Sequence, residues 1–421
     1  SPIPTIYLRL GWVGATVPSH PRVGRVMNIA KNHAVSSLRS SDSIGQPPDS
    51  PPFRFYDNRQ KYLAFINTCN EKSAIARRAI QELAHVKPSP PALRVFDAGM
   101  GDATVLSRLM RGMHRVFPAV PMSVVAKEIS LEDVRLGLEK MPGRFQEHPA
   151  TVLVVTNLNY AEAPRLMPRD THVAAALNWQ EVRLTGSSAH EYAEQIEELG
   201  PTLDYGWQTR SSPKSGNPVY LRPSVLVVYR EDHKFLLDSV IPKPGRIFES
   251  YDLIIASQPW RARMSAEFKA QRVLAPLIHS LSPGGRLLAI QSCGKDPALE
   301  IIRKLWPGEN PFQVDRHQLL AAVKTELGRD ARDFTLTALP DDKAIFRYEM
   351  HTLPSEIGDR IGTSTLFAAW NAAIYVNQIE DERLDSVVQN GDYLEATQQV
   401  LQQHGGLWFN DETFVVTRRR A

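Results

Sequence analysis

The first residues that can do chemistry form a glycine-rich turn, Asp97-Ala98-Gly99-Met100-Gly101-Asp102-Ala103. The turn follows the short apolar segment 93–98, which is typical of a strand, and precedes 104–117, which has helical spacing. Glycine lets the backbone turn sharply and approach a ligand where any side chain would clash. The free amides at the start of the following helix favour a carboxylate or a phosphate. We therefore expect a nucleotide-like ligand at this turn.

The spacing of the turn distinguishes two cofactor chemistries. The dinucleotide pattern is G-x-G-x-x-G/A, and counting from Gly99 its sixth position holds Thr104, so that pattern fails. The spacing acid-x-G-x-G-x-G fits, with Asp97, Gly99 and Gly101 in place and Ala103 in the last position. The departure at Ala103 is mild because alanine is nearly as small as glycine.

Two further groups of residues follow the next two expected strands, 122–129 and 151–156. Glu128 lies at the end of the first, where a carboxylate can accept both hydroxyls of a ribose. Asn157-Leu158-Asn159-Tyr160 follows the second, where side chains can read the edge of an adenine and stack on its ring. All three loops follow consecutive strands, so they share the edge of the sheet where ligands bind in open α/β folds. Each feature alone is equally well explained as an ordinary turn or strand end; the three in order favour a cofactor.

Together these residues resemble the class I methyltransferases that use S-adenosylmethionine (SAM), over residues 53–167 and 249–421. The resemblance implies SAM as the cofactor, with the first loop on its methionine part, the acid on its ribose and the third loop on its adenine. Carried over, the methionine part falls to Asp97, Ala98, Gly99, Met100 and Gly101, the ribose to Glu128 and Ile129, and the adenine to Asn157, Leu158 and Asn159.

The reaction end of the site is expected at Ser257-Gln258-Pro259-Trp260, after the strand 251–257. This loop is similar to the [Asn/Asp/Ser]-Pro-Pro-[aromatic] motif of enzymes that methylate nitrogen. In that motif a backbone carbonyl and the first side chain hold the target N–H groups, and the aromatic ring stacks on the target. Gln258 replaces the first proline, which weakens the rigidity of the loop. A proline turn with a packed tryptophan explains the residues equally well, so the sequence only leans towards nitrogen.

The elements that must position these loops alternate between strands and helices, which predicts a parallel sheet with helices on both faces. We expect a Rossmann-like α/β fold with a mostly parallel seven-stranded sheet and an antiparallel last strand, 412–417. Residues 168–248 interrupt this alternation and predict an inserted α+β lid between the third and fourth core strands. The insertion is expected to hold a helix, 189–199, and a hairpin of strands 224–229 and 235–241.

The chain thus divides into a flexible leader (1–52), the first half of the methyltransferase domain (53–167), the lid (168–248) and the second half (249–421). Met27 would suit a natural start, with 1–26 as translated upstream sequence. A lid tethered at the cofactor edge is placed to choose the substrate without contributing to SAM affinity. It is rich in aromatic residues, which suit a pocket for a small molecule or equally its own core or a homodimer contact: Trp179, Tyr192, Tyr205, Trp207 and Tyr220.

The composition narrows the remaining classes. It is ordinary for a globular protein, with 43% hydrophobic and 23% charged residues. A formal net charge of +3 gives no strong signal for nucleic acid. Two cysteines, Cys69 and Cys293, build no disulfide framework and fit a reducing cytoplasm. No histidine pairing predicts a metal, and no apolar run approaches the ~20 residues that span a membrane.

The expected function is SAM-dependent methyl transfer to a small-molecule acceptor. Methyl transfer from a sulfonium mainly requires that donor and acceptor are held in line. A base is needed only for a protonated acceptor, and the candidates are more often structural residues: His190, Glu191, Glu349 and His351. The alternatives are a methyltransferase acting on RNA or protein and a catalytically silent SAM-binding scaffold. An NAD-dependent oxidoreductase comes last.

Overall fold

The computed structural model describes residues 59–211 and 218–420. The predicted leader, 1–52, lies outside these residues. Within the described part of the chain, no helix is long and apolar enough to cross a membrane. The same part contains no group of three or more His, Cys, Asp or Glu side chains placed to hold a metal ion.

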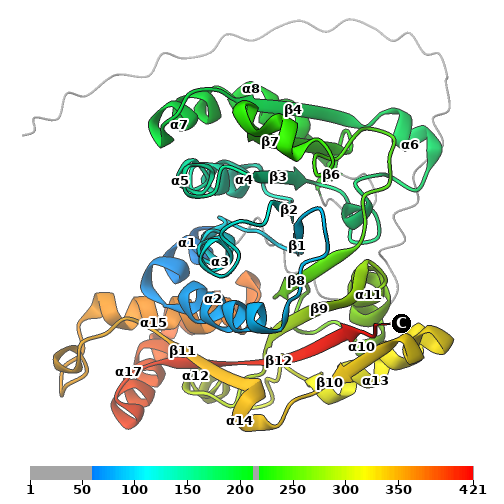
Figure 1. Ribbon diagram of the computed structural model, residues 1–421. Coiled ribbons are helices and arrows are strands. Elements are labelled where there is room, and N and C mark those ends of the chain that lie inside the picture. The colour runs from blue at the N-terminus through cyan, green and yellow to red at the C-terminus, as the bar shows by residue number, and fades with distance from the viewer. Residues whose placement is uncertain (1–58, 212–217, 421) are drawn as a thin grey trace, which may run out of the picture. The chain divides into compact units, whose positions relative to one another are not determined.

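The fold is built on a ten-stranded sheet with the order β10-β12-β9-β8-β1-β2-β3-β7-β4, in which β11 pairs with β12 (Figure 1). Neighbours among β3, β2, β1, β8 and β9 are parallel, and β12 is antiparallel to β9. The core strands are β1 (Leu93–Asp97), β2 (Met122–Lys127), β3 (Thr151–Thr156), β8 (Tyr251–Ser257), β9 (Leu281–Ser292), β10 (Phe334–Thr337) and β12 (Trp408–Arg418). The expected Rossmann-like α/β fold with an antiparallel last strand is confirmed.

The sheet has more strands than the seven expected. The additional ones are β4 (Asn178–Leu184), β7 (Ser224–Arg230) and β11 (Ile345–Glu349). β7 pairs antiparallel with β3, and β4 pairs parallel with β7, so the insertion extends the central sheet beyond β3. A separate two-stranded sheet is formed by β5 (Thr209–Ser211) and β6 (Pro218–Tyr220).

One strand of the expected hairpin was wrong. Residues 235–241 form no strand; they lie in and after the short helix α9 (Lys234–Leu237). Phe235 is 98% exposed and Leu237 is fully buried. A short apolar run fits a helix as well as a strand, and here Leu237, Val240 and Ile241 face the core at helical spacing.

Helices cover both faces of the sheet (Figure 1). Alternate strand residues point to opposite faces, so Val95 and Phe96 of β1 belong to different hydrophobic clusters. One face packs against α2 (Glu71–Glu82), α3 (Thr104–Val116), α4 (Leu131–Leu138), α5 (Pro142–Glu147), α7 (Ala189–Glu197) and α8 (Gly200–Gly206). The other packs against α9, α10 (Ala266–Lys269), the π-helical turn Ala270–Leu274, α11 (Ala275–His279) and α13 (Arg316–Leu327).

A third cluster joins helices from the two ends of the domain. Its helical members come mainly from α1 (Arg59–Thr68), α12 (Pro297–Leu305), α15 (Thr363–Val376) and α17 (Asp392–His404), and they pack against residues of α2, β11 and β12. The remaining helices are α6 (Thr171–Ala175), α14 (Asp341–Ala344) and α16 (Leu384–Asn390). Chain order reverses between β1 and β8, because β2 and β3 lie on one side of β1 and β8 and β9 on the other. Open α/β sheets bind their ligands at such a switch point, beyond the carboxyl ends of the strands.

Candidate functional site

The glycine-rich turn follows β1 and is held in a defined conformation. Gly101 has φ +53°, in the left-handed region where a side chain is strained. The amide of Gly99 donates to Asp97 Oδ1 at 3.1 Å, and the amide of Met100 donates to the Lys127 carbonyl at 3.0 Å. Ala98 and Met100 are buried, and their amides donate to the carbonyls of Ile255 and Lys127, so neither amide is free for a ligand. Burial raises the pKa of the Asp97 carboxyl to about 6, against the lowering effect of the Gly99 hydrogen bond.

The Glu128 carboxylate lies directly against this turn. Its Oε2 accepts the amide of Gly101 at 2.6 Å, and its Oε1 accepts the amides of Ile129 and Ser130 at 2.7 and 2.8 Å. An ionised carboxylate has about four acceptor positions, so these amides leave about one. The structure therefore brings the first and second predicted groups together, and it leaves the carboxylate about one further hydrogen bond, where the expected ribose contact would need two.

The side chains of the third predicted group face elsewhere. Asn157 is buried, donates to the carbonyls of Gly206 and Arg222 at 3.1 and 3.2 Å, and accepts the Ser224 amide at 2.8 Å. Each of these partners belongs to the insertion. The Asn157 side chain therefore fastens the insertion to the end of β3 and has no polar group left to read an adenine.

The other two residues of that group also have structural surroundings. Leu158 is buried in the core. Asn159 accepts the Ala161 amide at 2.9 Å and donates to Glu162 Oε2 at 2.7 Å, which closes a local turn. The adenine role assigned to this loop gains no support from the geometry.

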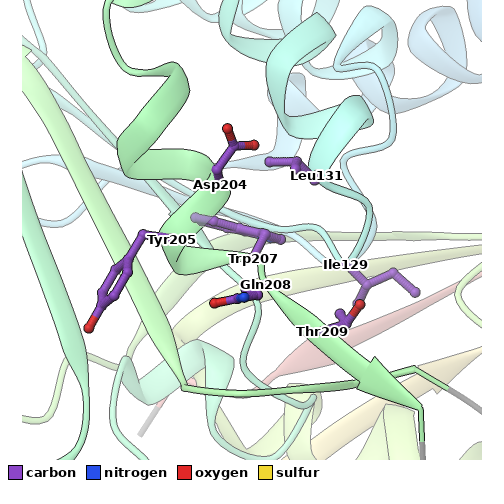
Figure 2. A pocket seen from close by; sticks show the side chains of 7 residues that line it. All are labelled: Ile129, Leu131, Asp204, Tyr205, Trp207, Gln208 and Thr209. Atoms are coloured by element: carbon purple, nitrogen blue, oxygen red, sulfur yellow. The ribbon is translucent and has the colours of Figure 1, made fainter. Parts of the chain in front are cut away.

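The insertion instead touches the loop that carries Glu128. Trp207 Nε1 donates to the Glu128 carbonyl at 2.9 Å, and the Tyr220 hydroxyl donates to the Ile129 carbonyl. A cavity of about 520 Å³ opens beside these contacts (Figure 2). It is lined by Ile129, Leu131, Asp204, Tyr205, Trp207, Gln208 and Thr209. Nothing in the sequence predicted that residues of the insertion would lie beside Glu128.

The loop after β8 has a conformation that the nitrogen motif does not allow. Gln258 has φ +50°, whereas a proline ring fixes φ near −65°. The Gln258 side chain donates to Ser292 Oγ at 2.9 Å and to Asp411 Oδ1 at 3.2 Å, and accepts the Ser292 amide at 3.2 Å. These hydrogen bonds supply the rigidity that we expected the loop to lose with the proline.

Asp411 is the least expected member of this group. It lies in β12, is fully buried, and its Oδ1 also accepts the Ser292 hydroxyl at 3.0 Å. Its Oδ2 has no hydrogen-bond partner among the described residues. Burial holds the pKa of this carboxyl well above its usual range, so the neutral form is favoured. Sequence reasoning missed it because Asp411 and its neighbour Glu412 form no motif that distinguishes them from the other polar residues of a strand.

Trp260 packs under the loop. It is 8% exposed, its Nε1 donates to Gln291 Oε1 at 3.1 Å, and Lys269 Nζ lies 5.6 Å from its ring centroid. The packed-tryptophan alternative therefore fits the structure better than a ring that stacks on a substrate. The Pro259 carbonyl accepts the Tyr160 hydroxyl at 3.0 Å, which joins the loops after β3 and β8.

Two buried or partly buried lysines lie near the turn and carried no signal in the sequence. Lys127 Nζ is 4.9 Å from the Tyr160 ring centroid, and burial lowers its pKa to about 8 despite the neighbouring Glu128. Lys72 Nζ, at the start of α2, is 3.5 Å from Glu71 Oε2 and 5.5 Å from the Tyr62 ring centroid. Lys127 ends β2 and Lys72 is in α2, and only the folded structure shows that both elements lie near the turn.

The candidate bases have surface or capping roles in this structure. Glu191 is the third residue of α7 and completes a capping box with Ser188. His190 is exposed and lies 3.5 Å from Glu194. Glu349 and His351 are also exposed, at the end of β11. Within the described part of the chain, none of the four forms a hydrogen bond or ion pair with the loop after β8.

Comparisons with known proteins give slight likenesses only. No protein-family profile and no curated protein matches the chain. A geranyl diphosphate methyltransferase in complex with GPP and sinefungin is 11% identical, covering 82% of this chain and 77% of its own, with TM-score 0.32. The plantazolicin methyltransferase BpumL in complex with SAH is 8% identical, covering 87% and 92%, with TM-score 0.33. The Haemonchus contortus phosphoethanolamine N-methyltransferase 2 in complex with SAM is 11% identical, covering 89% and 62%, with TM-score 0.29.

These solved structures are methyltransferases with SAM, S-adenosylhomocysteine (SAH) or sinefungin bound, which is the kind of protein that the sequence resembles. At such TM-scores the likeness carries no argument about this chain.

Proposed function

We propose that this protein transfers the methyl group of SAM to a small-molecule acceptor. The observation that carries the proposal is the placement of Glu128 against the glycine-rich turn, at the carboxyl edge of the sheet and beside its switch point. The chain keeps the acid and both glycines of the SAM spacing. Asp97 accepts the Gly99 amide and Glu128 accepts the Gly101 amide, which supports the proposal.

The turn has room for a ligand at Gly99. A Cβ built on this residue would meet no atom within 4 Å, and Gly99 is exposed. Asp97, Gly99 and Gly101 would hold the methionine part of SAM, and the remaining acceptor position of Glu128 would hold one ribose hydroxyl. Bound SAM supplies an activated methyl group on a sulfonium, and the protein must hold the acceptor in line with it.

The acceptor would lie at the loop after β8, next to the turn. Gln258 would shape this loop, because its side chain is held by Ser292 and Asp411. Ser257 and Pro259 flank it in the same loop. Trp260 would act from below the loop by packing. Methylation of nitrogen gains less support from the structure than from the sequence, because the φ of Gln258 is incompatible with the proline that the nitrogen motif has at this position.

A catalytically silent SAM-binding protein is the second candidate. The observation in its favour is that backbone amides already occupy most of the Glu128 carboxylate. A reducing, cytoplasmic setting fits either candidate, because both cysteines are free thiols.

The test of the proposal is a calorimetric titration of the full chain with SAM, SAH and NAD. We expect saturable one-to-one binding of SAM and SAH and no heat with NAD. Binding of NAD in preference to SAH would overturn the cofactor assignment. If SAH binds, incubation with methyl-labelled SAM and a cell metabolite extract separates the enzyme from the silent protein, since only the enzyme releases SAH.

A further inference from the structure

Aromatic side chains of the insertion hold it against the loop that carries Glu128. Trp207 and Tyr220 donate to the carbonyls of two consecutive residues, Glu128 and Ile129. Asn157 fastens the other side of the same segment to the end of β3. The position of the Glu128 loop therefore depends on the insertion, although the two are far apart in the sequence.

The cavity beside this loop has a composition that suits a nucleobase. Its volume, about 520 Å³, lies within the range of small-ligand pockets. Ile129, Leu131 and Trp207 provide apolar walls, and Gln208 and Thr209 provide polar groups (Figure 2). A glutamine amide offers a donor and an acceptor side by side, the pair that reads an adenine edge.

Not every lining residue faces a ligand in the same way. Tyr205 points away from the other lining side chains in Figure 2, and the Arg222 guanidinium lies 3.7 Å from its ring centroid. Gln208 is exposed, and its Oε1 is 3.4 Å from Arg222 Nη1, a long contact that a ligand can displace. Gln208 is therefore the lining residue whose side chain is available to a base, and it is the position to test.

Resting on the proposed function, we propose that this cavity receives the adenine of SAM and that Gln208 hydrogen-bonds the adenine edge. The base of a nucleoside is joined directly to its ribose, so a ribose held at Glu128 places the base next to Ile129. The loop after β3 cannot take this role because Asn157 and Asn159 are engaged elsewhere. The insertion thus sets cofactor affinity, which reverses the expectation that it acts on substrate choice alone.

The experiment is a calorimetric comparison of SAH with S-inosylhomocysteine, whose base carries an oxygen in place of the adenine amino group. The proteins are the full chain, Gln208→Ala and Gln403→Ala, the last a change at an exposed glutamine of α17 outside the cavity. We expect Gln208→Ala to weaken SAH roughly 5- to 30-fold, the loss of one or two hydrogen bonds, and to lose the preference for SAH over the inosine analogue. Gln403→Ala should bind both ligands as the unchanged protein does.

The outcomes separate the inference from the function on which it rests. If the unchanged chain binds SAH and Gln208→Ala binds it equally well with the same base preference, the adenine lies elsewhere and the inference is overturned. If the unchanged chain binds no SAH, the proposed function fails and the inference fails with it. Gln208→Glu, which keeps the shape of the side chain but replaces its donor with a second acceptor, decides the case if Gln208→Ala does not fold.

Discussion

The contacts of Glu128 allow a quantitative prediction for its removal. The carboxylate has about one acceptor position left for a ribose hydroxyl, and a hydrogen bond to a charged group contributes about 1.5–3 kcal/mol. Loss of that bond should weaken SAH binding roughly 10- to 150-fold. Glu128→Ala also leaves the amides of Gly101, Ile129 and Ser130 without their acceptor, at about 1–3 kcal/mol for each one that stays buried. That variant therefore loses fold stability as well as affinity.

Glu128→Gln separates the two effects. Its side-chain carbonyl can still accept the amides of Ile129 and Ser130, while its amide group faces Gly101 and can accept neither that amide nor a ribose hydroxyl. We expect a smaller drop in melting temperature than for Glu128→Ala and a similar loss of affinity, measured by calorimetry. Analogues of SAH that lack the 2′- or the 3′-hydroxyl identify the bond, because one of them should bind both proteins alike. Full SAH affinity in a folded Glu128→Gln protein would refute the reasoning.

Three further predictions concern the frame of the site. Gln258→Pro forces φ from +50° towards −65° and removes the backbone donor to the Ile290 carbonyl. It should destabilise the fold by more than about 1 kcal/mol in urea unfolding, whereas Gln258→Gly should cost less. Equal stabilities of the two variants would contradict this. Asn157→Ala should cost about 2–3 kcal/mol in the same assay, and a cost below about 0.5 kcal/mol would mean that the insertion is held otherwise. Because burial raises the Asp97 pKa from 3.8 to about 6, the folded state binds the proton more tightly, and the free energy of unfolding falls as pH rises through that window. Asp97→Asn should remove this fall. The difference in free energy of unfolding, variant minus unchanged protein, should therefore increase by up to about 3 kcal/mol from pH 4 to pH 6, and a constant difference would contradict the raised pKa.

Much of the fold could be predicted because strand and helix periodicity is local. The apolar segments and the glycine-rich turn were identifiable in order, and parallel strands place the loops that follow them at one edge. The insertion was harder. Residues 224–229 read as a strand, but whether β7 would pair with β3 or with a partner inside the insertion depends on contacts far apart in the sequence.

Site residues could be predicted where the backbone sets their role and not where side-chain partners do. Asp97, Gly101 and Glu128 lie together because their strands are neighbours. An asparagine after β3 is equally able to bind an adenine or to fasten a loop, and only the insertion decides which Asn157 does. Asp411 carries no local pattern, so its contact with the loop after β8 becomes visible only when β12 is placed beside β9.

The central claim is that a SAM-type ligand lies against the turn after β1. Gly101 is a poor position for the test, because its φ of +53° and the Tyr62 hydroxyl, 3.4 Å from an added Cβ, would strain any substitution. Gly99 is free of both problems, since an added Cβ meets no atom within 4 Å and its φ lies outside the left-handed region. The measurement is the calorimetric affinity of Gly99→Val for SAH beside the unchanged chain. We expect Gly99→Val to keep the melting temperature of the unchanged chain and to lose SAH binding. Unchanged SAH affinity in the folded variant would contradict the placement of the ligand against this turn.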